Sequence, residues 1–160
     1  MPTGPFRVVT VQGQRRSDKR AVAFLERDDD PALNARAVFE ALSEKRTREV
    51  RTRFDYWIDG FPRDNYFHGW PNQPEYKGCF VFKYQEQRRN CRFYGFLHHP
   101  LKKRRAFQVC VLASHAIKPG WNTDPRELNA MNALRVDGHV IAAIEMVFSD
   151  EKAEATAWLN

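Results

Sequence analysis

Three runs of aromatic and β-branched residues decide the fold: KGCFVFKY at 77–84, NCRFYGFL at 90–97 and AFQVCVLASHAIK at 106–118. Polar and charged segments separate them, at 85–89 and at 98–105. Aromatic and β-branched side chains favour extended backbone, and short polar segments between such runs are typical of turns. The stretch therefore predicts an antiparallel meander of three strands.

The same stretch carries the positive charge of the chain. Residues 77–118 hold ten lysines and arginines against one acid, Glu86, a net of +9, and the other 118 residues hold 16 bases and 19 acids, a net of −3. A field of one sign on one part of a protein points to a polyanion, most commonly a phosphate backbone. Bases can also protect exposed strand edges against aggregation. Their concentration in two loops, 88–89 and 102–105, favours nucleic-acid contact over that alternative.

Length and composition predict one globular domain over residues 1–160, with a short N-terminal extension and an acidic C-terminal tail anchored by Trp158. The chain has 160 residues, 42% of them hydrophobic, enough for a core without covalent cross-links. Its three cysteines, Cys79, Cys91 and Cys110, show no metal-binding spacing and are interpreted as reduced core thiols. Without an apolar leader or an apolar run near the ~20 residues that a spanning helix needs, we expect a cytoplasmic protein with no membrane contact.

The flanking segments predict the remaining elements. Two short apolar runs, 6–11 and 21–25, are candidate strands; we expect one of them to join the sheet and favour the second, because it directly precedes a helix start. Asp28 to Pro31 has the acids and the proline of a helix N-terminus, and apolar residues follow at helical spacing. The pattern continues through the charged segment 44–53 to Gly60, so two helices or one bent helix should precede the meander.

The segment before the meander predicts a loop, and the segment after it predicts helices. Residues 61–76 are rich in proline and asparagine and predict a loop, whose aromatic residues are expected to cover the core rather than to stack on bases. Asp124, Pro125 and Glu127 form a capping-box pattern that begins a helix, Gly138 ends it, and 139–148 reads as a short helix. The predicted fold class is α+β: an antiparallel sheet of the meander plus one N-terminal strand, packed with two N-terminal helices and a C-terminal helix.

The chain lacks the common signatures of catalytic and nucleotide-binding sites. It has no glycine-rich phosphate loop, no G-x-S-x-G and no H-E-x-x-H. His98, His99 and His115 are close enough in the sequence to be considered as a metal site, but adjacent histidines in a strand point to opposite sides and no acid lies nearby. We therefore expect neither a metal nor a cofactor.

Arg92 and Lys118 are the strongest candidates for function. Arg92 lies within an apolar strand run, where an unpaired charge is costly, so it should face a cleft, an acid or a ligand. It could equally extend to solvent from an outward strand face. Lys118 ends the third strand just before a loop, where functional residues concentrate.

The order of these elements and their short motifs resemble the RelE/HigB-like toxin superfamily, especially its phage-related HigB branch. The resemblance rests on GCFVFK at 78–83, CRFYGF at 91–96, VCVLASHAIK at 109–118 and TDPREL at 123–128. It covers roughly residues 20–136. Members of the superfamily have a strand, two helices, a meander with a strand-borne arginine, a lysine near the end of the last strand, and a final helix.

The resemblance implies ribosome-dependent cleavage of mRNA, within a toxin–antitoxin type of system. Arg92 and Lys118 would stabilise the reacting phosphate, and His115 would act as acid or base. Six further bases would hold RNA backbone without reading sequence: Arg88, Arg89, Lys102, Lys103, Arg104 and Arg105. RNA and a possible antitoxin protein are the expected partners. The enlarged 61–76 segment keeps an alternative open, a non-catalytic RNA- or protein-binding module that uses the same basic sheet face.

Overall fold

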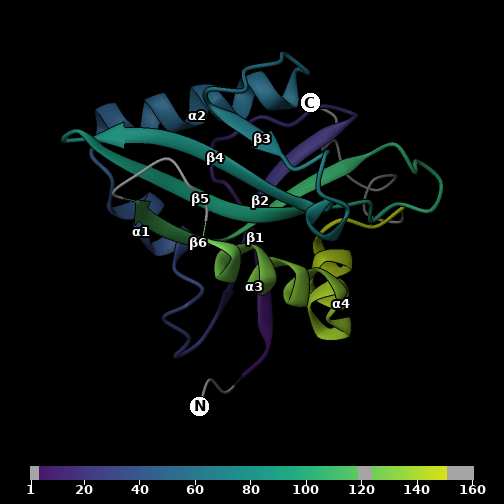
Figure 1. Cartoon of the computed structure of the whole chain (residues 1–160). Coiled ribbons are helices and arrows are strands. Elements are labelled where there is room, and N and C mark those ends of the chain that lie inside the picture. Colours follow the sequence, from purple (N-terminus) through teal and green to yellow (C-terminus); the bar gives the residue numbers. More distant parts are fainter. Residues whose placement is uncertain (1–3, 119–123, 151–160) are drawn as a thin grey trace.

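A computed structural model describes residues 4–118 and 124–150 and shows one mixed sheet with helices on both faces (Figure 1). Its order is β1-β2-β6-β5-β4-β3; β2 and β6 pair in parallel, and the other neighbouring strands pair antiparallel. The six strands are β1 (Phe6–Thr10), β2 (Arg20–Arg27), β3 (Phe67–Gly69), β4 (Cys79–Glu86), β5 (Arg89–His98) and β6 (Gln108–Lys118).

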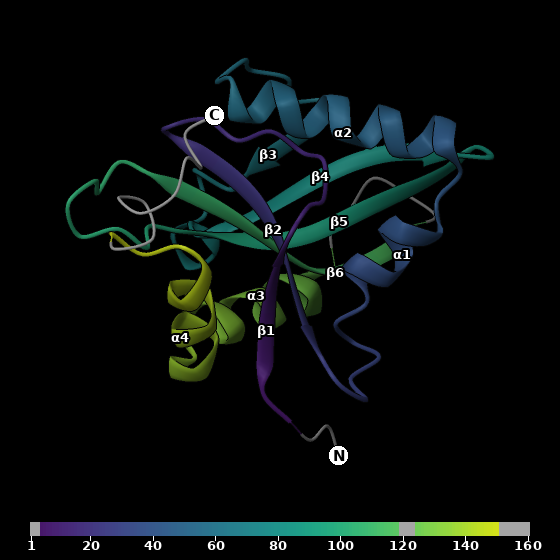
Figure 2. The ribbon, with the colours of Figure 1, turned by 180° about the vertical axis from the view of Figure 1, so that it is seen from behind.

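The described residues form four α-helices: α1 (Ala35–Ala41), α2 (Glu44–Ile58), α3 (Pro125–Val136) and α4 (Gly138–Val147). The predicted fold class counted three helices and is wrong in that number, although α4 matches the short helix expected at 139–148. In Figures 1 and 2, α2 runs along one face of the sheet, and α3 and α4 lie against the opposite face. None of these helices combines the length and apolar character that crossing a bilayer requires. The predicted tail with Trp158 lies outside the described residues.

The predicted antiparallel sheet of four strands is wrong, although the meander itself is confirmed as β4, β5 and β6. Both N-terminal runs join the sheet, as β1 and β2, and β2 pairs in parallel with the end of the meander, so the sheet is mixed. The expected loop 61–76 contains β3, which pairs with β4. Two of its aromatic residues cover the core as expected, because Phe67 and Trp70 are 6% and 9% exposed, whereas Tyr66 is only partly buried and lines a cavity.

Two hydrophobic cores lie on the two faces of the sheet. Successive side chains of the central strands point alternately into one core and the other. Val109 and Val111 of β6 pack toward α3 and α4, whereas Cys110 and Leu112 pack toward α1 and α2. Strand β2 is buried from 21 to 25 in the same way. Continuous apolar runs of this kind are typical of strands that are covered on both faces. All three cysteines are buried free thiols.

Local capping signals explain where most helices begin. The Ser43 side chain accepts from the backbone N–H of Arg46 at the start of α2, and the Asp124 side chain accepts from that of Arg126 at the start of α3. The prediction for α1 is wrong, because this helix begins at Ala35 and not at Pro31. Residues 28–34 instead form turns that bring the Asn34 side chain to the backbone of β6.

A β-bulge interrupts the pairing of β5 with β6. Tyr94 lies opposite Ser114, but Gly95 lies opposite Leu112, so Ala113 is the extra residue. A Cβ at position 95 would lie 2.8 Å from the Val111 carbonyl carbon and 2.9 Å from the Leu112 Cα. Only glycine fits this close approach of two backbones. The bulge fixes which residues on the last part of β6 share a face with those on β5.

Candidate functional site

Three cations lie on adjacent strands at one end of the sheet. Lys83 of β4 is opposite Arg92 of β5, and Lys118 of β6 is opposite Asn90, two residues before Arg92. Residues opposite one another in an antiparallel pair, and residues two apart on a strand, share a face. The Nζ atom of Lys118 also lies 6.0 Å from the ring centroid of Tyr94 on that face. Lys83, Arg92 and Lys118 are called the cation row below.

Burial strengthens the field of this row. The Arg92 side chain is 3% exposed, and Lys83 and Lys118 are half-buried. Burial, and then the charge of Arg92, lower the pKa of Lys83 below its ordinary value. Like charges held together in a partly desolvated place favour binding of an anion between them. The row therefore has the charge and position to bind a phosphate.

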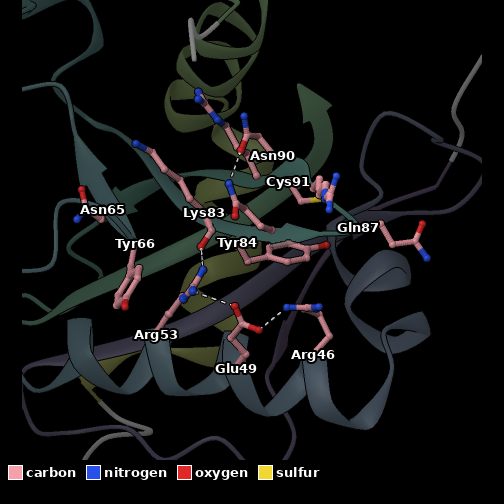
Figure 3. Close-up of a pocket in the computed structure, with 13 residues that line it drawn as sticks. Arg46, Glu49, Arg53, Asn65, Tyr66, Lys83, Tyr84, Gln87, Asn90 and Cys91 are labelled. Carbon is pink, nitrogen blue, oxygen red and sulfur yellow. Dashed lines mark hydrogen bonds and ion pairs between the residues drawn. The ribbon is translucent and has the colours of Figure 1, made fainter. Parts of the chain in front are cut away.

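A cavity of about 540 Å³ adjoins the cation row along the edge of β4. The Lys83 N–H donates to the Tyr66 carbonyl at 2.7 Å, and the Arg53 guanidinium binds the Lys83 carbonyl, so the edge is capped where β3 ends. Figure 3 shows Arg53, Glu49 and Arg46 reaching from α2 toward this edge. Among the residues that the structure describes, five cations and one acid, Glu49, line the cavity: Arg46, Arg53, Lys83, Arg88 and Arg92.

Glu49 holds two of these cations in place. Its carboxylate accepts from Arg53 at 2.9 Å and also from Arg46, the side chains lying one helical turn apart on α2. The Arg53 guanidinium is stacked over the Tyr66 ring, 4.2 Å from its centroid. Charged groups fixed in this way lose little conformational freedom when a ligand binds. The α2 wall of the cavity is thus pre-organised.

The turn between β4 and β5 lines part of the cavity. It has two residues, Gln87 and Arg88, between the paired residues Glu86 and Arg89. Both have left-handed backbone, with φ of 52° and 65°. Two-residue hairpins of this type favour asparagine and glycine, so glutamine and arginine are strained there. The strained turn places the exposed Arg88 at the cavity.

His115 does not join Arg92 and Lys118. It lies opposite Phe93, on the face covered by α1 and α2, and its Nε2 atom is 2.8 Å from the Tyr84 hydroxyl. Burial lowers the pKa of His115 to about 4, so the ring is neutral at pH 7. Residues 115 and 118 are three apart and so point to opposite faces of a strand. That spacing alone could have separated His115 from Lys118 in the sequence.

The predicted RNA-binding residues fall at two distant places. Arg88 and Arg89 lie at the start of β5, and the loop 102–105 follows its end. This strand has ten residues, so its two ends lie roughly 30 Å apart at about 3.4 Å per residue. The loop is exposed, and the Lys102 and Lys103 backbone N–H groups donate to the Asp150 carboxylate. Figure 1 shows the two ends on opposite sides of the molecule.

Sequence reasoning missed three residues of the site. Lys83 lies in an apolar strand run and carried the same signal as Arg92. Arg46 and Arg53 belong to the charged segment 44–53, which was interpreted only as a continuation of the helix. Within the described residues, no three His, Cys, Asp or Glu side chains are grouped to hold a metal ion.

Comparisons with known proteins place no constraint on this site, because no family model, curated protein or solved structure matches the chain.

Proposed function

We propose that this chain is a toxin-type RNA endonuclease that cleaves mRNA on the ribosome, as the RelE/HigB-like resemblance implies. The observation that carries the proposal is the cation row, with Lys83, Arg92 and Lys118 on one face of three adjacent strands. Elements β2, α1, α2, β4, β5, β6 and α3 also follow one another in the order that the resemblance implies.

The chemistry follows from the charge of the row. The 2′-oxygen of a ribose attacks the adjacent phosphorus, its proton passes to solvent, and the bond from phosphorus to the 5′-oxygen breaks. The products are a 2′,3′-cyclic phosphate and a free 5′-hydroxyl. Negative charge grows on the phosphorane, so cations fixed around it stabilise the transition state more than the bound substrate. Arg92 and Lys118 supply that charge.

Lys83 takes the acid role that sequence reasoning gave to His115. The leaving 5′-oxygen needs a proton, and a neutral imidazole on the opposite face cannot supply it. Lys83 faces Arg92 across the strand pair, and burial together with Arg92 lowers the pKa of its ammonium group. A lowered pKa makes a lysine a better proton donor near neutrality.

RNA and protein partners belong to the same proposal. The exposed loop 102–105 would hold RNA backbone away from the row, and an acidic antitoxin would silence the row by covering it. Because association between opposite charges is steered electrostatically, the antitoxin should bind rapidly at low salt.

Induced expression tests the proposal. The wild-type protein should arrest growth, and purified protein should cut ribosome-bound mRNA. Arg92→Gln and Lys83→Gln should each lower the cleavage rate by about 100-fold or more, the usual effect of removing one preorganised charge or proton donor. Lys77→Gln, an exposed cation on the same strand run, serves as the control.

Two outcomes would overturn the proposal. Wild-type protein that is harmless and leaves the message intact would remove the enzymatic function. RNA binding that weakens steeply with salt, without cleavage, would instead assign the non-catalytic binding module. Thermal unfolding of each variant separates lost chemistry from lost fold.

A further inference from the structure

We infer that the cavity beside the cation row is a subsite for one nucleotide, which binds its phosphate through arginines and its base through a flat polar wall. The inference rests on the proposed function for its substrate class, because the cavity shares Lys83 and Arg92 with the row. A nucleotide held there would lie next to the phosphate that is cut.

Size and charge fit such a ligand. The cavity has a volume of about 540 Å³, within the roughly 300–1,000 Å³ of small-molecule sites. Five cations against one carboxylate favour a phosphate, and Glu49 already fixes two of the five guanidinium and ammonium groups. A phosphate binding Arg46 and Arg88 would add charge-assisted hydrogen bonds, the strong class of hydrogen bond.

The wall of the cavity suits a base. The Arg53 guanidinium lies over the Tyr66 ring and both residues line the cavity, and unstacked bases of single-stranded RNA stack on aromatic rings and on guanidinium planes. Four amide side chains, each able to donate and accept, also line the cavity: Asn65, Gln85, Gln87 and Asn90. Amides of this kind can pair with the polar edge of a base.

A peptide strand fits the same edge poorly. Adding a strand needs a row of free backbone groups on β4. The outward N–H and C=O of Lys83 are already bound by Tyr66 and Arg53, and the turn begins at Gln87. In an antiparallel pair, every second residue directs its backbone N–H and C=O away from the partner strand. Between Lys83 and Gln87, only Gln85 therefore has both groups directed outward. One residue is too short a template for a strand.

Titration with nucleoside 3′-monophosphates at low salt tests the inference on the full-length protein. Each ligand is compared with inorganic phosphate, with the matching nucleoside, and with a hexaglutamate peptide. We expect a nucleotide to bind at least about tenfold tighter than phosphate or nucleoside alone. Arg46→Gln with Arg88→Gln should weaken it at least about tenfold, because each charge-assisted contact contributes about 1.5–3 kcal/mol, on the order of a tenfold change or more.

Two further variants make the test specific. Lys19→Gln with Lys77→Gln removes the same charge from exposed positions outside the cavity and should change the affinity less than about twofold. Tyr66→Leu should abolish the preference for nucleotide over phosphate while phosphate still binds, because it removes the aromatic ring and the surface on which the Arg53 guanidinium lies. An unchanged far-ultraviolet spectrum and unfolding midpoint confirm that each variant is folded.

Three results would overturn the subsite. Phosphate binding as tightly as the nucleotides would leave an anion site without a base wall, tighter binding of hexaglutamate would assign a protein partner, and equal losses in both double variants would mean unspecific attraction. The proposed function fails separately: nucleotide binding without mRNA cleavage removes the enzymatic function and keeps the subsite. Cleavage of mRNA without nucleotide binding removes the subsite and keeps the enzymatic function.

Discussion

Lys83 and Arg92 show how single residues set the character of the site. Two cations opposite one another on neighbouring strands repel, and burial makes the repulsion stronger than at an exposed surface. The folded chain tolerates this arrangement because the surrounding strands and the Arg53 cap fix the backbone of Lys83. A bound phosphate would reduce this repulsion, so the pair favours an anionic ligand.

His115 gives a pH-dependent test at this scale. Its pKa is about 4 in the folded protein and about 6.5 when unfolded, so below pH 6.5 the unfolded state binds a proton that the folded state does not. Stability is therefore complete above pH 6.5 and falls as the pH drops toward 4. The ring is partly exposed, so the discounted loss at pH 4.5 is on the order of 1–2 kcal/mol.

Urea unfolding at pH 4.5 and 7.5 measures this loss. His115→Gln, which keeps an acceptor for the Tyr84 hydroxyl, should reduce the pH dependence. His139→Gln, at an exposed position at the start of α4, should leave it unchanged. An identical dependence in the wild type and His115→Gln would show that another group titrates; His68 and His98, whose pKa values burial also lowers, are the next to replace.

At the scale of elements, the bulge in β5 and β6 gives the next prediction. Gly95→Ala would place a methyl group against the Val111 backbone, and neither strand can move without disturbing both cores. We expect a loss of about 3 kcal/mol or more in the free energy of unfolding, the range for strain in a packed core.

Gly138→Ala is the matched control. A Cβ there meets nothing within 4 Å, at the first residue of α4. This change should be neutral or stabilise by up to about 1 kcal/mol, because alanine loses less backbone entropy in a helix. Denaturant unfolding of both variants compares them directly, and equal effects would contradict the steric role of the bulge.

At the scale of the molecule, the basic charge is divided between two ends of one strand. The hairpin end carries the cation row and the cavity, and the loop 102–105 lies about 30 Å away along β5. A strand of RNA that reached both ends would bind through several phosphates, each releasing counterions. Neither end alone accounts for the net +9 of residues 77–118.

Charge reversal separates the two ends. Changing Lys102, Lys103, Arg104 and Arg105 to glutamate should lower RNA affinity and reduce the salt slope of binding by about 0.7 for each phosphate of single-stranded RNA that the loop no longer neutralises. Mononucleotide binding in the cavity, measured in 0.1 M salt, should stay within about twofold, because the loop lies about 30 Å away and the Debye length is then about 10 Å. An equal reduction of the RNA affinity and of the mononucleotide affinity would show that the loop and the cavity act as one site.

Local patterns determined the parts of this protein that depend on neighbouring residues. The meander, α2, α3 and the buried cysteines follow from side-chain periodicity and from capping residues such as Ser43 and Asp124. Arg92 was identified as a functional candidate for the same kind of reason, a charge within an apolar run. In each case the energy that decides the structure is local, so the sequence signal lies within one element.

Long-range pairing decided the rest. The parallel pairing of β2 with β6, and the inclusion of β1 and β3, depend on backbone hydrogen bonds between segments far apart in the chain, and side-chain type does not specify the partner. The bulge at Gly95 sets the register of β6 against β5 and so brings Lys118 to the face of Lys83 and Arg92. Arg46 and Arg53 became part of the site only because α2 packs on the sheet face opposite to the cation row and its arginines reach the edge of β4, where residues from both faces line the cavity.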